Sequence, residues 1–165
     1  MTEGRLLHVP GLCVYTVPKV ASYAIRSAMK RAKTANPNED IPGFRFMVVR
    51  HPLERLVSCW AFFGHNRGMA FEDFWGVCRQ NYMQDVHTMP QACFTGGRRM
   101  DRRVRLEALN EEWDKIREKF PRLGRIKQRN ASEHGPWQAY FTPDIQAEAE
   151  EIYAADLALY RSAIG

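Results

Sequence analysis

Residues 44–60 read FRFMVVRHPLERLVSCW, and this stretch has the pattern of a buried strand that turns directly into a helix. The run from Phe44 to Val49 is predominantly apolar, which is typical of a buried strand. Pro52 stands where a helix can begin without losing a needed N–H group. Apolar residues then follow at helical spacing, namely Leu53, Leu56, Val57 and Trp60. The segment therefore predicts a strand, a short turn and a helix.

The same pattern occurs once earlier in the chain. Leu12 to Val17 is predicted as a buried strand that ends at Pro18-Lys19, and a helix is predicted from Ser22 to Lys33 with Ser22 as its N-cap. Two successive units of this kind favour parallel strands, with ligands beyond their carboxyl ends. The expected fold class is α/β, as a three-layer, P-loop-like fold with a small central parallel β-sheet flanked by helices.

The rest of the chain predicts further helices and one more strand. Helices are expected over 71–81 and 109–120, with an irregular stretch over 82–100 and a short strand from Val104 to Leu106 between them. A last helix is predicted from Thr142-Pro143-Asp144 to Tyr160, because its apolar residues share one stripe. No linker or repeat divides the chain, so residues 1–165 are expected to form a single domain.

The composition is that of a globular protein, with 45% hydrophobic and 26% charged residues. A net charge of +5 indicates anionic partners without naming them. The four cysteines lack CxxC spacing, so buried thiols are expected and no metal site. No stretch approaches the roughly 18–20 apolar residues of a membrane span, and no signal-peptide pattern opens the chain. We therefore expect a soluble, cytoplasmic protein.

Lys19 stands at the carboxyl end of the first predicted strand, where the chain turns into a helix. Such a turn presents backbone N–H groups and the positive end of a helix to an anion, and Lys19 adds a mobile point charge. The pattern GxxxxGK[ST] is absent, with the small residues Ala21 and Ser22 in place of glycines. The turn suits a phosphate or phosphosulfate. This motif alone supports equally well the alternative that Lys19 is only a solvated charge at a strand end.

Arg50 ends the second strand at the same edge, and Ser58 lies on the helix face that returns to it. A guanidinium and a hydroxyl suit a phosphate monoester. In a nucleoside triphosphatase this strand usually ends in an aspartate that holds Mg²⁺. A transferred sulfuryl group carries less negative charge than a phosphoryl group, so lysine and backbone donors can stabilise it without a metal, which leaves Arg50 for a second phosphate.

These residues resemble a known family. PKVASYAIRSAM (residues 18–29) is similar to the 5′-phosphosulfate loop of sulfotransferases that use 3′-phosphoadenosine 5′-phosphosulfate (PAPS), and FMVVRHPLERLVSCW (46–60) is similar to their 3′-phosphate segment, in the carbohydrate branch. The resemblance continues more loosely through HTMPQ, VRLEAL, RNAS and IYAADLALY. It implies PAPS as sulfuryl donor, no metal, and a hydroxyl acceptor on a glycan, with neither nucleic acid nor a membrane segment as partner.

The resemblance also implies roles for single residues. Lys19 would contact the bridging oxygen of the donor, and Arg50 and Ser58 would bind its 3′ phosphate. The 5′ phosphosulfate would lie on the backbone of Val20, Ala21, Ser22, Tyr23 and Ala24. Tyr23 departs from the family, which usually has a threonine there, and the chain is shorter than typical members, which implies trimmed acceptor loops.

Removal of the acceptor proton requires a base, usually a histidine or a carboxylate. His87 is the first candidate, because it lies in the irregular stretch and matches a histidine of the carbohydrate branch. His65 is the second, and His51 is expected to be a structural neighbour of Arg50. Glu54 and Asp85 are the carboxylate alternatives.

Two further features and two other functions stay open. Glu107 either orients a catalytic group or caps the following helix, and the structural role is favoured. The arginines between 98 and 105 either face solvent or contact an acidic acceptor. A small P-loop kinase or hydrolase would need the missing GK[ST] and an aspartate for magnesium. A nonenzymatic basic module that binds a polyanion would need a recognisable nucleic-acid signature, which the sequence lacks.

Overall fold

The computed structural model describes residues 5–127 and 134–165, and its centre is a five-stranded sheet in the order β3-β1-β2-β4-β5. Three neighbouring strands are parallel: β2 (Gly11–Thr16), β4 (Gly43–Val49) and β5 (Arg102–Arg105). Two strands that the sequence did not predict extend the sheet, β1 (Arg5–Val9) and β3 (Lys33–Ala35), and β1 is antiparallel to both of its neighbours. The predicted α/β class with parallel central strands is confirmed.

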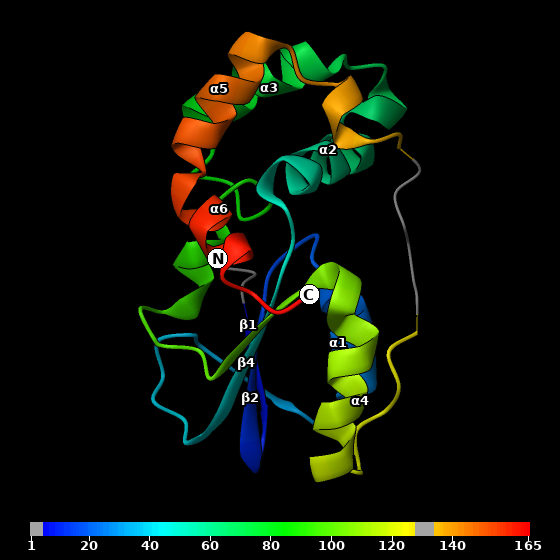
Figure 1. Ribbon diagram of the computed structural model, residues 1–165, viewed down its shortest axis with the longest axis vertical. Helices are drawn as coiled ribbons and strands as arrows, with labels where there is room; N and C mark the ends of the chain where they lie inside the picture. Colours follow the sequence, from blue (N-terminus) through cyan, green and yellow to red (C-terminus); the bar gives the residue numbers. More distant parts are fainter. Residues whose placement is uncertain (1–4, 128–133) are drawn as a thin grey trace.

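Helices cover one side of the sheet and one end of its strands (Figure 1). On the covered side lie α1 (Ser22–Ala28) and α4 (Leu109–Lys119). Beyond the end where β4 runs into α2 lie α2 (Pro52–Phe63), α3 (Phe71–Asn81), α5 (Pro143–Ile152) and α6 (Ala154–Arg161). Short 3₁₀ turns occupy His65–Arg67, Gln91–Thr95, Leu106–Ala108 and Trp137–Ala139. This arrangement leaves the turns after β2 and β4 beneath the α2 layer.

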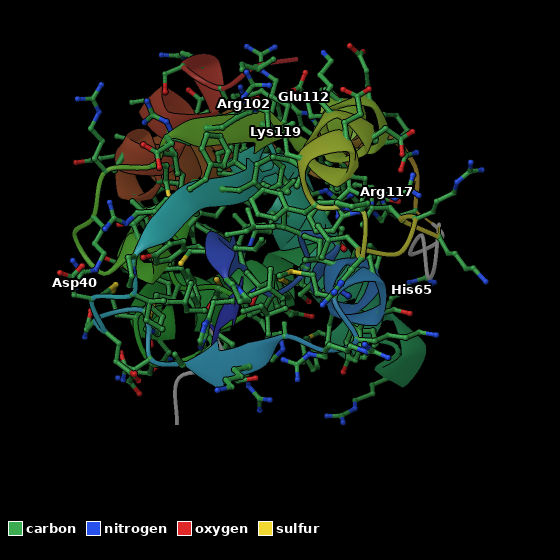
Figure 2. All side chains as sticks on the ribbon, turned by 90° about the horizontal axis from the view of Figure 1, so that it is seen from below. Asp40, His65, Arg102, Glu112, Arg117 and Lys119 are labelled. Atoms are coloured by element: carbon green, nitrogen blue, oxygen red, sulfur yellow. The ribbon has the colours of Figure 1, made fainter. Side chains whose placement is uncertain are left out.

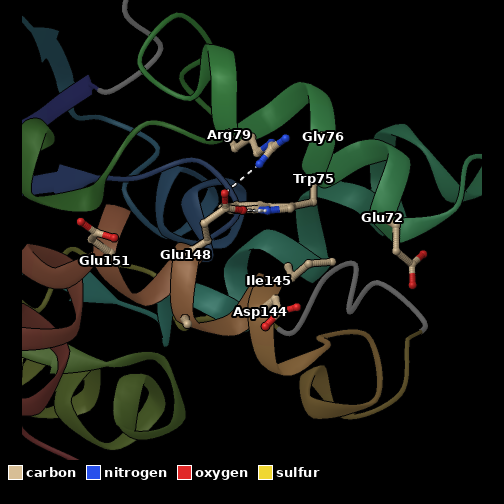
Figure 3. Close-up of a pocket in the computed structure, with 9 residues that line it drawn as sticks. Glu72, Trp75, Gly76, Arg79, Asp144, Ile145, Glu148 and Glu151 are labelled. Carbon is tan, nitrogen blue, oxygen red and sulfur yellow. Dashed lines mark hydrogen bonds and ion pairs between the residues drawn. The ribbon is translucent and has the colours of Figure 1, made fainter.

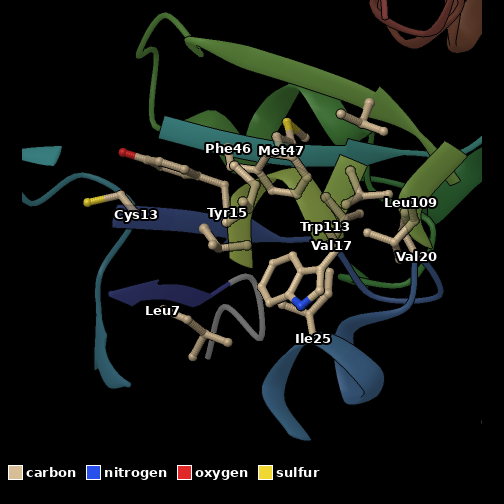
Figure 4. Close-up of a cluster of buried hydrophobic side chains, with 14 of the residues drawn as sticks. Leu7, Cys13, Tyr15, Val17, Val20, Ile25, Phe46, Met47, Leu109 and Trp113 are labelled. Atoms are coloured by element: carbon tan, nitrogen blue, oxygen red, sulfur yellow. The ribbon is translucent and has the colours of Figure 1, made fainter. Parts of the chain in front are cut away.

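The main core lies between the sheet and the helices α1 and α4 (Figure 4). Trp113 of α4 is fully buried and meets Phe46 of β4 edge to face, with ring centres 6.0 Å apart. Ile25 of α1 joins the same cluster. Truncation of such buried aromatic side chains costs about 3–5 kcal/mol, so this core fixes the sheet on which the site is built.

A close approach of two glycines sets the spacing of β2 and β4. Gly43 lies opposite Gly11 in the parallel register and has φ +151°. A Cβ atom on Gly43 would come within 2.8 Å of the Gly11 carbonyl carbon. Gly43 therefore has to be glycine for the two strands to begin side by side, whereas Gly11 favours glycine because its φ is +82°.

The helix predicted over 22–33 is too long at its carboxyl end, and its predicted cap is wrong. It ends at Ala28, whose carbonyl oxygen accepts from the distant Gly124 N–H at 2.8 Å, and residues 33–35 form an edge strand instead. Ser22 is the first residue of the helix, and Ala21 occupies the N-cap position. Tertiary hydrogen bonding has overridden the local helical pattern.

The long carboxyl-terminal helix predicted to Tyr160 is also wrong, because it breaks at Tyr153 into α5 and α6. The Tyr153 side chain is buried, and its hydroxyl donates to the carbonyl oxygen of Thr88 at 2.5 Å. The third predicted strand is displaced as well, since β5 covers Arg102–Arg105 and Leu106–Ala108 forms a 3₁₀ turn.

Candidate active site

Two neighbouring parallel strands deliver Lys19 and Arg50 to the same edge of the sheet. β2 and β4 pair in register with Tyr15 opposite Met47, and the chain leaves both strands at this edge. Nη1 of Arg50 donates to the main-chain carbonyl oxygen of Lys19 at 3.4 Å. The structure thus brings together the two basic residues that the sequence singled out.

The turn between β2 and α1 holds two non-glycine residues in the left-handed region. Lys19 has φ 65° and Ala21 has φ 52°, a conformation that costs about 1–2 kcal/mol per residue. The Val20 N–H donates to the Val17 carbonyl oxygen at 3.2 Å, which closes the turn. Turns of this kind direct successive N–H groups into a concavity that suits an anion.

The Lys19 ammonium group lies beside an aromatic ring. Its Nζ atom is 4.1 Å from the centre of the Phe62 ring, a cation–π contact, and 60% of Phe62 remains exposed. Burial lowers the pKa of Lys19, which the neighbouring Cys59 partly offsets and Arg50 reinforces. The ammonium is therefore partly desolvated and placed where the α2 layer meets the turn.

Arg50 is held from several sides. Its Nη2 atom donates to Glu54 at 2.9 Å, and its main-chain N–H and C=O bond the Gln91 side chain at 3.0 and 2.8 Å. Asp156 of α6 accepts from the Gln91 N–H at 2.8 Å. Helix α6 therefore holds Gln91 in the position where it bonds Arg50. Within the described part of the chain, Arg50 Nε is buried and has no hydrogen-bond partner.

The other residues predicted to bind the donor differ in exposure. Ser58 lies one turn after Glu54 on α2 and is only 2% exposed. Val20 and Ala24 are buried, whereas Tyr23, on the first turn of α1, is 78% exposed. The backbone of this segment is therefore well anchored, while the Tyr23 side chain faces solvent.

His87 forms a pair with Asp85 in the loop between α3 and the 91–95 turn. Its Nδ1 atom lies 2.8 Å from Asp85 Oδ1, and its main-chain N–H donates to the same oxygen at 2.9 Å. Burial would raise the pKa of Asp85, but these hydrogen bonds and the charge of His87 lower it overall. The His87 ring packs on Phe63 at 4.7 Å, and the Cys59 thiol donates to the His87 carbonyl oxygen at 3.0 Å.

The two other histidines considered have different surroundings. His65 is exposed in the turn after α2 and packs against the edge of Trp60 at 5.0 Å. His51 is the N-cap of α2, is stacked on Trp137 at 5.0 Å and is packed against Tyr160. Burial lowers the pKa of His51, against the effect of nearby carboxylates. The environment of His51 is that of a structural residue.

Comparison with known proteins assigns the chain to a family. The model of the sulfotransferase family matches residues 13–161. The chain belongs to the sulfotransferase family. Searches of curated proteins and of solved structures found no match. The matched range runs from β2 through α6, and so includes both strand ends and the His87 loop of this sulfotransferase.

Arg55 is a residue that the sequence analysis missed. It is 1% exposed, and its guanidinium donates to three carbonyl oxygens: Pro18 at 3.1 Å, Met89 at 2.8 Å and Val86 at 3.2 Å. One side chain thereby joins the start of the Lys19 turn to the loop that carries His87. A charged residue within the apolar pattern of α2 was the available clue, because a buried charge must be partnered.

Several arginines between 98 and 105 form hydrogen bonds within this sulfotransferase. Arg98 bonds Asp40 at 3.1 Å, Arg102 bonds Glu112, and Arg105 donates to the Tyr160 carbonyl oxygen at 3.2 Å. Figure 2 shows Arg102 and Glu112 together between β5 and α4. The Glu107 carboxylate accepts from the Tyr160 hydroxyl at 3.3 Å. These contacts support structural roles for Glu107 and for at least three of the arginines.

Two of the hollows that the described residues line are found in the helical layer. The larger, of about 610 Å³, lies between α3 and α5 and is lined mainly by acidic side chains around the Trp75 ring (Figure 3). The smaller, of about 210 Å³, has Phe63 and Asp85 in its wall and so borders the His87 pair. In the residues that the structure describes, no helix is long and apolar enough to cross a membrane.

Proposed function

We propose that this sulfotransferase moves a sulfuryl group from PAPS to a hydroxyl of a carbohydrate by direct in-line transfer that needs no metal ion. The observation that carries the proposal is the convergence of Lys19 and Arg50 from adjacent parallel strands, in a chain whose family match spans both. The donor and acceptor classes rest on the resemblance of residues 18–29 and 46–60 to the two donor-binding segments of the carbohydrate branch.

The residues present fit an anionic nucleotide with two phosphate positions. The left-handed turn at Lys19 and Ala21 offers N–H groups to the 5′ phosphosulfate. Arg50 keeps a buried Nε–H without a partner among the described residues, which suits a second phosphate, with the Ser58 hydroxyl as a further donor. Glu54 holds Arg50 in place, and a bound 3′ phosphate would share the guanidinium with it.

Lys19 stabilises the leaving group in this mechanism. As the acceptor oxygen bonds to sulfur, the bond between sulfur and the bridging phosphate oxygen breaks, and negative charge develops on that oxygen. An ammonium that is already partly desolvated interacts strongly with such a charge. The contact with Phe62 holds Nζ near the end of α2 before substrates bind.

His87 takes the acceptor proton. The Asp85 carboxylate at Nδ1 keeps a proton on that nitrogen, so Nε2 is the ring atom to which the attacking hydroxyl would pass its proton. The developing imidazolium is stabilised by the same carboxylate, whose lowered pKa keeps it ionised at neutral pH. Asp85 acts here as a positioning residue and His87 as the general base.

Replacement of His87 by glutamine tests this assignment. We expect kcat to fall about 10²–10⁴-fold, because general-base catalysis contributes a factor of that size. Affinity for 3′-phosphoadenosine 5′-phosphate (PAP) should stay within a factor of two or so, since no donor contact is removed. Release of PAP from PAPS with a carbohydrate acceptor gives the first quantity, and calorimetry gives the second.

His65→Gln provides the matched control, because His65 is the other histidine candidate and is exposed. It should leave both quantities unchanged. Full turnover by the His87 variant would remove His87 from the mechanism, and loss of turnover in the His65 variant would move the base to His65.

A further inference from the structure

The smaller hollow, of about 210 Å³, is built mainly from apolar side chains. Phe63 from the end of α2, Met69 from the following turn, and Phe74 and Val77 from α3 form its walls. Burial raises the pKa of the Cys78 thiol to about 12, so this wall residue is neutral as well. Such a lining favours an apolar ligand group over a charged one.

The hollow is continuous with the proposed base. Asp85 and Thr88 belong to its wall, and Asp85 Oδ1 is the atom that lies 2.8 Å from Nδ1 of His87. Phe63 contributes to the same wall and also contacts the His87 ring at 4.7 Å. A molecule that places a hydroxyl at His87 therefore lies beside a hollow whose wall includes two residues that contact His87.

A row of aromatic rings joins this region to Lys19. The Phe62 and Phe63 rings meet edge to face at 4.8 Å, and Phe62 in turn lies 4.1 Å from Lys19 Nζ. Cys59, one turn before Phe63 on α2, ties this helix to the base as well, since its thiol donates to the His87 carbonyl oxygen at 3.0 Å. Lys19, His87 and the hollow are thus connected through Phe62 and Phe63 at the end of α2.

We propose that the hollow binds a neutral apolar substituent of the acceptor, namely an aryl or short alkyl group carried by the molecule whose hydroxyl is sulfated. The inference rests on the proposed function, because it uses His87 as the point where the hydroxyl lies. Its size sets the class of substituent: about 210 Å³ is below the range of about 300–1,000 Å³ that whole drug-sized ligands occupy, and suits a single ring.

Surface charge supports a neutral group. The hollow has one carboxylate, Asp85, beside the base and one guanidinium, Arg67, among its wall residues. An anionic substituent would meet the Asp85 carboxylate, and a cationic one would compete with His87 for it. Val77 is 61% exposed and Met69 is 38% exposed, so both offer apolar surface that a ring would cover.

The test compares matched phenyl and methyl β-glycosides of glucose, galactose and N-acetylglucosamine. Their binding to the PAP-loaded protein is measured by calorimetry, and their sulfation is measured separately with PAPS. For at least one sugar, the phenyl glycoside should bind about tenfold or more tightly than the methyl glycoside, as expected when one apolar group enters a pocket. Equal binding within every pair would overturn the proposal.

Two exposed positions provide the variant and its control. Val77→Lys places a charge in the wall of the hollow, and Met83→Lys places one on a residue that is 49% exposed, follows α3 and is not part of the wall. The phenyl preference should disappear in Val77→Lys and persist in Met83→Lys, with PAP affinity unchanged in both. An undiminished preference in Val77→Lys would overturn the proposal.

The two readouts separate this inference from the proposed function. Phenyl-selective binding that Val77→Lys abolishes supports the hollow even where no sulfate is transferred to either glycoside. Absence of transfer from PAPS, with PAP bound normally, counts against the proposed function alone. Transfer to both glycosides with no difference in their binding or KM overturns the hollow and leaves the proposed function standing.

Discussion

Arg55 joins the segment that contains Lys19 to the segment that contains His87. Its three hydrogen bonds connect the turn after β2 to the 86–89 loop. Each bonded residue lies 31 to 37 positions from Arg55 in the chain. Lys19 follows directly after one of the bonded carbonyl groups, and His87 lies between the other two. A single guanidinium can therefore keep Lys19 and His87, the proposed leaving-group residue and the proposed base, in register.

Replacement of Arg55 by methionine should lower the free energy of unfolding by about 3 kcal/mol or more, because one buried and two partly buried carbonyl groups each lose their donor at about 1–3 kcal/mol. Urea denaturation measures the change. Arg79→Met is the matched control, since Arg79 forms an exposed ion pair with Glu148, and exposed pairs contribute about 0–1 kcal/mol. If the Arg55 variant loses no more stability than the control, the bridging role is wrong.

Among the elements, α4 is attached to β5 through a buried carboxylate. The Glu112 side chain is 4% exposed and bonds both Arg102 of β5 and Lys115 of its own helix. The Lys115 hydrogen bond is the main cause that lowers the pKa of Glu112, and Arg102 adds to it, whereas burial opposes it. A carboxyl group whose pKa is lower in the folded state stabilises the fold above its ordinary pKa and loses that contribution as the pH falls.

Glu112→Gln should therefore destabilise the protein by about 1–3 kcal/mol at neutral pH. The difference from wild type should shrink as the pH falls from the ordinary value of 4.5 through the lower folded value. Urea unfolding across this range measures it. Glu111→Gln, at the exposed partner of Lys115 on the same helix, should cost no more than about 0.5 kcal/mol. A difference that does not change with pH would contradict the role given to the carboxylate.

Local sequence patterns predicted some of the secondary-structure elements and missed the ends of others. The two strand–turn–helix units were predicted because their apolar runs, Pro52 and the strand-end cations are all local features. The early end of α1 and the break at Tyr153 were not, since they depend on hydrogen bonds to Gly124 and Thr88, far away in the chain. An apolar stripe looks the same whether or not such a bond interrupts the helix.

Some residues of the candidate site could likewise be predicted from the sequence, and others could not. Lys19 and Arg50 could be found because parallel strands end at one edge and each cation follows a strand directly. Gln91 could not, because it bonds main-chain groups of Arg50 that come near only after folding. The charge of Arg55 within the apolar pattern of α2 was a clue, but its three bonding partners could not be named before folding brings them together. The pairing of His87 with Asp85 could have been predicted from sequence, because the two residues are only two positions apart. The sequence analysis considered Asp85 only as an alternative base.

At the scale of the whole molecule, the sheet, α2 and α6 together build the proposed site for an anionic nucleotide. β2 supplies Lys19, β4 supplies Arg50, and Asp156 of α6 holds Gln91 against Arg50. The positive net charge of +5 favours the approach of such a ligand. Arg50, the proposed 3′-phosphate residue, thus depends on Asp156, which lies near the carboxyl-terminal end of the family match over 13–161.

The most direct measurement is the affinity for PAP compared with that for adenosine 5′-phosphate, which lacks the 3′ phosphate, by calorimetry on the wild-type protein and on Arg50→Met. The wild type should bind PAP about 10–100-fold more tightly, since charge-assisted hydrogen bonds to one phosphate contribute about 1.5–3 kcal/mol. Arg50→Met should lose most of this difference while its affinity for adenosine 5′-phosphate stays nearly constant. Equal affinity of the wild type for the two nucleotides would contradict the assignment of Arg50 to the 3′ phosphate, and with it the PAPS-dependent function.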